Sequence, residues 1–274
     1  MKRNPSPFYL VVLFALSMML IPVTALARDA LRQDHRMVSE QIFNLPLREG
    51  NYQRVLLSTP LSARGTIVML PGGTGNIGLE QDGHIRHNKN FLIRTRALWN
   101  RRGYAVLIPD STDHANLRGV RSSSIYGHIV DDLVKFAHLH GTTPVFLLGT
   151  SQGTIAAVNG AAHAAPGSIA GLVLTESVSV MGGSGETVFD ADPQHVSIPV
   201  LVVANRDDRC KVAPPKAANQ IAAAMTASRN VHVLIVSGGI NKSTKACGSL
   251  TPHGYYGIED SVVGAISHWM DAQN

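Results

Sequence analysis

The stretch Gly149-Thr150-Ser151-Gln152-Gly153 places a serine between two glycines, directly after an apolar run over residues 145–148. The small residues 154–162 that follow predict a helix. Strand, tight turn and helix are the context of a G-x-S-x-G nucleophile elbow, which exposes its serine hydroxyl at the carboxyl end of the strand. Flanking glycines remove the Cβ atoms that would clash in so sharp a turn. Ser151 is therefore the candidate nucleophile, although a glycine-bounded turn with a serine N-cap would show the same pattern.

Apolar runs recur along the chain, with helical patterns between them. They predict strands over residues 55–57, 66–70, 104–108, 145–148, 172–174, 199–203 and 231–236, and residues 37–45 could add an antiparallel edge strand. Helices are predicted over residues 91–101, 125–138, 217–225 and 258–270. This alternation indicates an α/β fold: a doubly wound, mostly parallel sheet with helices on both faces. Residues 176–197 are too few for a large cap domain, so we expect at most a small lid over residues 180–194.

The first 27 residues have the features of a secretory signal peptide. Lys2 and Arg3 form a basic start, an apolar stretch follows, and Ala25-Leu26-Ala27 is a cleavage signal. We expect cleavage after Ala27, export to the periplasm or the medium, and a single domain over residues 28–274. No other apolar run is long enough to cross a membrane, so stable membrane insertion of the mature chain is not expected.

Charge and cysteine content narrow the classes of protein further. Without Lys2 and Arg3, the 24 basic residues fall to 22 against 19 acidic ones, a mild excess with no basic cluster of the kind that binds nucleic acid. Two cysteines, Cys210 and Cys247, remain in an exported chain. An even cysteine count in an oxidising compartment favours a disulfide between them.

An acid and a histidine follow the late strands in an informative order. Asp207 and Asp208 lie in the loop that follows the strand over residues 199–203, and His253 lies between the last strand and the last helix. The order of Ser151, an aspartate and His253 is the one used by α/β-hydrolases. The histidine would take the serine proton, and the acid would fix its tautomer and stabilise the imidazolium.

Asp208 is the preferred acid and Asp207 the alternative. Alternation along the loop points one of the two side chains inward, and Asp208 is nearer to the downstream residues 212–214. The other aspartate is expected to be a solvated partner of Arg206 or Arg209.

The oxyanion hole needs two backbone N–H groups aimed at the developing charge. One is expected from Gln152, the residue after the nucleophile. The other is expected from Gly73, with Thr74 as the alternative, in the glycine-rich loop Pro71-Gly72-Gly73-Thr74-Gly75 after the strand over residues 66–70. Glycine in this loop lets backbone amides face a ligand without side-chain interference.

Together these motifs resemble the α/β-hydrolase superfamily over most of residues 50–274. The resemblance implies hydrolysis of an ester, thioester or amide of a small molecule through an acyl-enzyme, without metal or organic cofactor. One departure is Pro71, which stands where many members have histidine before the oxyanion glycine. A catalytically inactive hydrolase-like binding protein is the first alternative.

The second alternative is an NAD(P)-dependent reductase, because residues 73–78 match G-x-G-x-x-G after a strand. That fingerprint should open a helix at once, whereas the polar residues 80–89 intervene. No Tyr-x-x-x-Lys pair accompanies it, and export argues against a nicotinamide pool. His84 and His87 lack further ligands at a recognisable metal-site spacing, so a polar loop is expected there.

One more loop bears on the substrate. Residues 111–124 carry His114, Arg118 and Arg121, and they are expected on the rim of the site. This loop could receive a carboxylate-bearing substrate, although plain solvation of a polar loop explains the same charges.

Overall fold

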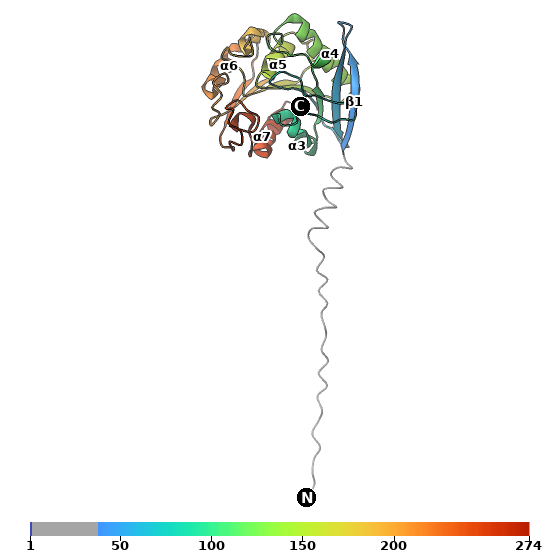
Figure 1. Cartoon of the computed structure of the whole chain (residues 1–274), viewed down its shortest axis with the longest axis vertical. Helices are drawn as coiled ribbons and strands as arrows, with labels where there is room; N and C mark the ends of the chain where they lie inside the picture. The colour runs from blue at the N-terminus through green and yellow to red at the C-terminus, as the bar shows by residue number, and fades with distance from the viewer. Residues whose placement is uncertain (2–37, 274) are drawn as a thin grey trace. The chain divides into compact units, whose positions relative to one another are not determined.

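The chain folds around one sheet of eight strands. In chain order they are β1 (Val38–Pro46), β2 (Tyr52–Pro60), β3 (Thr66–Leu70), β4 (Ala105–Pro109), β5 (Val145–Thr150), β6 (Gly171–Thr175), β7 (Val200–Asn205) and β8 (Val231–Val236). Their order in the sheet is β1-β2-β4-β3-β5-β6-β7-β8 (Figure 1). The computed structural model describes Met1 and residues 38–273. Residues 2–27 of the expected signal peptide therefore lie outside the described residues.

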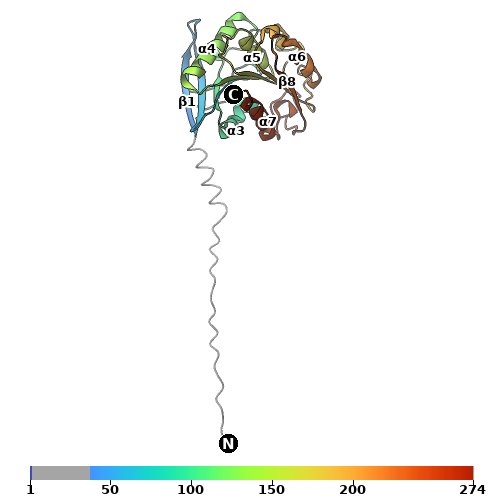
Figure 2. The same cartoon turned by 180° about the vertical axis from the view of Figure 1, so that it is seen from behind.

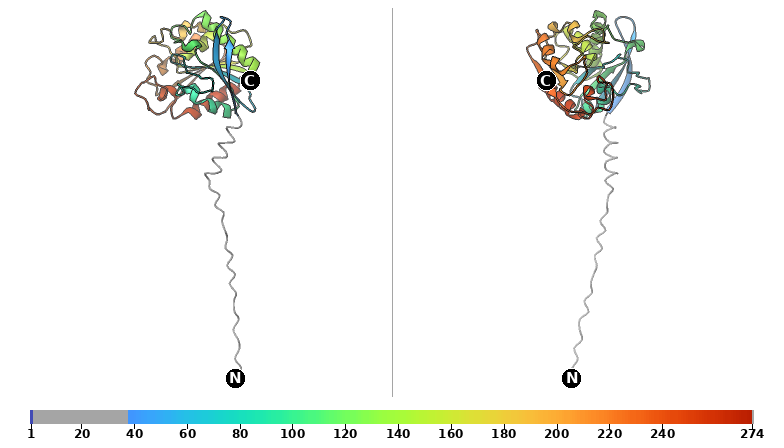
Figure 3. Two further views of the ribbon diagram at one scale, coloured as in Figure 1. Left: turned by 45° about the vertical axis from the view of Figure 1, so that its right-hand side comes forward. Right: turned by 60° about the vertical axis from the view of Figure 1, so that its left-hand side comes forward.

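The sheet is mostly parallel, as predicted. Strands β4, β3, β5, β6, β7 and β8 run parallel to one another, and β1 forms the expected antiparallel edge. The strand over residues 55–57, grouped with the parallel runs above, is antiparallel to both of its neighbours. The reason is the short connection from β1 to β2, because a few residues can join only antiparallel strands. Figure 3 shows this β1–β2 hairpin at one edge of the sheet.

Helices cover both faces of the sheet. Helices α4 (Ser124–His140), α5 (Gly153–Ala162) and α6 (Ala218–Ala224) lie on one face, and α3 (Arg96–Arg101) and α7 (Glu259–Asp271) lie on the other (Figures 1 and 2). Strand side chains alternate between the two layers. In β3, for example, Val68 and Leu70 join the core under α4 and α5, and Ile67 and Met69 join the core under α3 and α7.

The helix predicted over residues 91–101 is two short helices, α2 (Phe91–Arg94) and α3, which meet at Thr95. The Thr95 hydroxyl donates to the Phe91 carbonyl at 2.6 Å and accepts from the indole N–H of Trp99 at 3.2 Å. A threonine hydroxyl that bonds the preceding turn competes with the backbone ladder, which explains the break.

No large cap covers the sheet in the part of the chain that the structure describes. Residues 176–198 form two 3-10 turns, η2 (Val188–Asp190) and η3 (Pro193–His195), which pack against α5. Among the described residues, the helices are all too short or too polar to cross a bilayer.

Candidate active site

Ser151 lies in the predicted sharp turn between β5 and α5. Its φ is 54°, in the left-handed region that non-glycine residues rarely adopt. A Cβ on Gly153 would lie 1.9 Å from the carbonyl oxygen of Leu70, and one on Gly149 would lie 2.5 Å from the Gly153 carbonyl oxygen. Both flanking positions therefore require glycine, because the strand and the helix approach too closely for any side chain.

A chain of two hydrogen bonds joins Ser151, His253 and Asp208. The distance from Ser151 Oγ to His253 Nε2 is 3.0 Å, and that from His253 Nδ1 to Asp208 Oδ2 is 2.7 Å. Asp208 follows β7, and His253 lies in the 3-10 turn η5 (Pro252–Gly254) between β8 and α7. The carboxylate of Asp208 and the imidazole are both buried. The parallel sheet brings these three residues together because each follows the carboxyl end of a strand.

Asp207 does not contact His253. Its carboxylate accepts the Gly238 N–H at 2.6 Å, lies 3.6 Å from Arg206 Nε and is 44% exposed. In contrast, Asp208 Oδ1 accepts the Cys210 N–H at 2.8 Å, which turns the second oxygen toward the imidazole. Of the two aspartates that the sequence left open, the structure brings Asp208 to the histidine.

The glycine loop after β3 lies against the elbow. A Cβ on Gly72 would lie 2.7 Å from the Thr150 carbonyl oxygen and 3.5 Å from the Gln152 backbone nitrogen. Gly73 has a φ of 65° and lines the cavity beside Ser151. The loop thus brings the Gly73 segment next to the N-terminus of α5, where the two expected oxyanion donors belong. Thr74, the alternative donor, also lines the cavity.

The rest of this loop is held by Asp110, a buried residue that directly follows β4. Its carboxylate accepts the N–H groups of Ile77 and Leu79 at 2.8 Å each. Residues 79–90 then form turns and one isolated bridge, and the next helix begins only at Phe91. The glycine motif therefore opens no helix for a pyrophosphate, which removes the main support for the reductase alternative.

Arg121 does not lie free on the rim as expected; it is 1% exposed. Its guanidinium donates to the Gly73 carbonyl at 3.0 Å and to Gln152 Oε1 at 3.4 Å, so it bridges the glycine loop and the elbow. Burial lowers the pKa of Arg121, and the neighbouring carboxylate of Glu186 opposes that effect. Sequence alone gave no signal for this role, because only the tertiary arrangement buries the loop.

Cys210 and Cys247 form the expected disulfide, with an S–S distance of 2.02 Å. The bond joins the loop that carries Asp208 to the loop that carries His253. It therefore ties together the two segments that hold the acid and the base.

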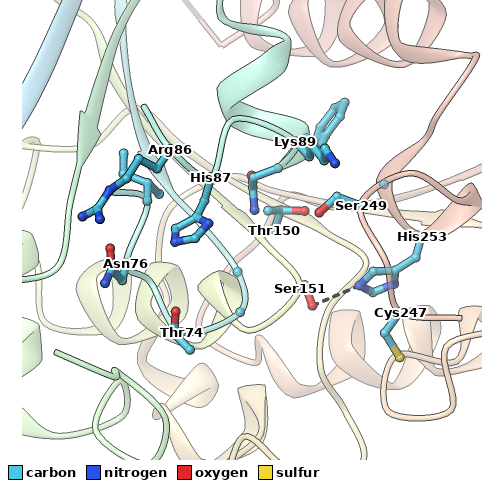
Figure 4. A pocket seen from close by; sticks show the side chains of 16 residues that line it. Thr74, Asn76, Arg86, His87, Lys89, Thr150, Ser151, Cys247, Ser249 and His253 are labelled. Carbon is cyan, nitrogen blue, oxygen red and sulfur yellow. Dashed lines mark hydrogen bonds between the residues drawn. The ribbon is translucent and has the colours of Figure 1, made fainter. Parts of the chain in front are cut away.

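A cavity of about 420 Å³ opens in front of Ser151 (Figure 4). Its walls come from residues 72–77, residues 86–91, the elbow and residues 247–254. Residues 180–194, expected to form a small lid, contribute none of the lining. Arg86 and His87 lie on the side of the cavity away from His253, and Lys89 also lines it, so the basic residues of this rim are not the ones that the sequence indicated.

Glu176 was also missed, although it directly follows β6. Its buried carboxyl lies with the Asp208 carboxyl and the His253 imidazole in a cluster whose ligand atoms are within 4.8 Å of one another. Burial and then the charge of Asp208 raise the pKa of Glu176 well above its usual range. Because Asp208 Oδ2 and His253 Nδ1 already bond each other, the geometry fits a proton network better than a metal site.

Comparison with solved structures reveals clear likeness in fold. A dienelactone hydrolase from Anabaena variabilis has a TM-score of 0.62 and 17% identity, with 86% of this chain and 98% of that chain covered. An esterase from Pyrococcus furiosus has a TM-score of 0.60 and 12% identity, over 87% of this chain and 93% of the other. Est1E from Butyrivibrio proteoclasticus has a TM-score of 0.59 and 16% identity, with 85% of this chain and 98% of that chain covered.

Neither protein-family models nor curated proteins match this sequence. The strand order, the helices on both faces and the solved structures nevertheless agree with the resemblance drawn from the elbow, the glycine loop and the order of the acid and the histidine. The chain has the α/β-hydrolase fold.

Proposed function

We propose that the protein is a serine hydrolase that cleaves the ester bond of a small substrate through an acyl-enzyme. The hydrogen-bonded chain of Ser151, His253 and Asp208 is the observation that carries this proposal. The esterases and the dienelactone hydrolase of the same fold support a hydrolase in general.

In the first half-reaction, Ser151 Oγ attacks the carbonyl carbon while its proton passes to His253 Nε2. Asp208 accepts the Nδ1–H and stabilises the imidazolium. The backbone N–H groups of Gln152 and Gly73 would bind the oxyanion of the tetrahedral intermediate. As the intermediate collapses, the bond to the leaving group breaks, and His253 gives its proton to the departing alkoxide.

In the second half-reaction, a water molecule attacks the acyl carbon and loses its proton to His253. Collapse of this second intermediate returns the proton to Ser151 Oγ and releases the acid. The same steps would cleave a thioester or an amide. A cavity of about 420 Å³ that no large cap covers within residues 38–273 suits a small substrate.

Labelling with a fluorophosphonate tests the proposal directly. The wild type should be labelled, and Ser151→Ala and His253→Ala should lose labelling while they keep the thermal unfolding curve of the wild type. A panel of short acyl esters, thioesters and peptides would then rank the bond types. A folded wild type that shows no labelling dependent on Ser151 would favour the inactive binding protein instead.

We also infer that the protein is exported and cleaved after Ala27. The basic start, the apolar stretch and the A-x-A signal support this, and the disulfide suits an oxidising compartment. Mass spectrometry of the protein from its own cells should find a chain that begins at Arg28. A chain that retains residues 1–27 would contradict the inference.

A further inference from the structure

Glu176 is a buried acid behind Asp208 to which the proposed mechanism gives no role. Its side chain follows β6, one strand away from the strand that carries Asp208, and the residue is 1% exposed. Its φ is 48°, in the left-handed region, and its backbone N–H donates to the Val203 carbonyl at 3.1 Å. Strained backbone persists where the surrounding structure fixes it, and it concentrates at functional sites.

The hydrogen bonds of Glu176 leave one oxygen unexplained. Oε1 accepts the Asn205 N–H at 2.7 Å. Oε2 is buried and has no partner with hydrogen-bond geometry among the described residues, although the Tyr255 hydroxyl also acts on this carboxyl. The acid next to it is Asp208, whose two oxygens accept from Cys210 N–H and from His253 Nδ1–H and keep lone pairs for another donor.

The protonation of Glu176 follows from its neighbours. The titratable groups that face it are Asp208 after β7, His253 in η5, and Tyr255, whose buried hydroxyl donates to the Val203 carbonyl at 3.2 Å. Burial, followed by the charge of Asp208, raises the pKa of Glu176 well above its usual value. Burial likewise raises the pKa of Tyr255. Asp208 is therefore the group that carries the negative charge in this cluster.

We propose that Glu176 is a positioning residue for Asp208: its neutral carboxyl donates the Oε2–H to the Asp208 carboxylate. This bond satisfies the buried Oε2 and fixes the acid that orients His253. The role rests on the proposed serine-hydrolase function. If Glu176 loses its proton at alkaline pH, the hydrogen bond to Asp208 is lost and the two carboxylates repel each other, so Asp208 is no longer held in place to orient His253.

Kinetics of para-nitrophenyl acetate hydrolysis test the catalytic part. Glu176→Gln keeps a donor at the same place but cannot ionise, so it should retain most of kcat and lose the alkaline limb of the pH profile. Glu176→Leu removes the donor and should lower kcat roughly 10- to 100-fold with KM unchanged, since a hydrogen bond to a charged group is lost. Tyr255→Phe is the control for the other buried acid and should keep the alkaline limb.

Infrared spectroscopy tests the proton without relying on catalysis. The wild type at neutral pH should show the carbonyl stretch of a neutral carboxyl group, and Glu176→Gln should lack it. If the wild type shows no Ser151-dependent labelling, the proposed function fails, and the infrared band still decides the state of Glu176. Absence of that band, equal kcat losses for Gln and Leu in folded variants, or an alkaline limb that survives in Glu176→Gln would each overturn the proposal.

Discussion

The disulfide offers the sharpest test of how the site is held, through the double variant Cys210→Ser/Cys247→Ser. The bond closes a loop with a sequence separation of 37 residues. The chain-entropy model gives such a loop about 4 kcal/mol of stabilisation. In a domain of this size each kcal/mol shifts Tm by about 2–4 °C, so the variant should melt roughly 8–16 °C below the wild type.

The effect on activity should exceed this loss of stability. Cys210 donates its backbone N–H to Asp208, and Cys247 lines the cavity on the segment that leads to His253. Without the bond, the acid and histidine loops can separate, and displacements of about 1 Å cost up to about 100-fold in rate. We expect kcat to fall about tenfold or more at a temperature where circular dichroism shows the variant folded.

Leu133→Ala is the matched control for the disulfide variant. Leu133 is buried in α4, far along the chain from either loop, and its truncation should cost about 2–5 kcal/mol. The control should lose stability comparably but keep kcat per folded molecule. If both variants lose the same fraction of kcat, the bond stabilises the fold in general and has no special role at the site.

Four further outcomes follow from the geometry. Asp208→Asn should lower kcat about 10⁴-fold because the histidine tautomer is lost, whereas Asp207→Asn should change kcat less than about threefold by the same steady-state assay. Gly153→Ala should destabilise the fold by about 3 kcal/mol or more in urea unfolding, since its Cβ would lie 1.9 Å from a carbonyl oxygen of β3. Lys89→Ala should lower kcat/KM for a carboxylate-bearing ester up to about fivefold and leave its neutral analogue unchanged. The raised pKa of Glu176 lets the native state keep a proton that the unfolded chain loses above the ordinary glutamate pKa. The Tm of the wild type should therefore fall as the pH rises through this range, and the Tm of Glu176→Gln should fall less.

The sequence predicted the fold well because the signals involved are local. Apolar runs mark the strands of a covered sheet, and the elbow requires glycine at two fixed positions. The hairpin is the exception: residues 55–57 are as apolar as a parallel strand, and only the short connection to β1 reveals their direction. The break at Thr95 was missed for a similar reason, since one side-chain hydrogen bond decides it.

The candidate site was predicted only where position along the chain is sufficient. Ser151, Asp208 and His253 could be named because each follows a strand and because their order is informative. Arg121 could not, since a charged residue in a polar loop has the same local pattern whether it is solvated or buried. Only the packing of that loop against the elbow places its guanidinium on Gly73 and Gln152.

The charge of Glu176 bears directly on how Asp208 and His253 work together. A general base must be a neutral imidazole at rest, and one adjacent carboxylate then stabilises the imidazolium as it forms. Two ionised carboxylates side by side would repel each other, and Asp208 would lose the neighbour that holds it in place against His253. With Glu176 neutral, the cluster carries the single negative charge of Asp208, which matches the one positive charge that develops on His253. The buried proton on Glu176 is therefore a requirement of the proposed mechanism and not only a consequence of burial.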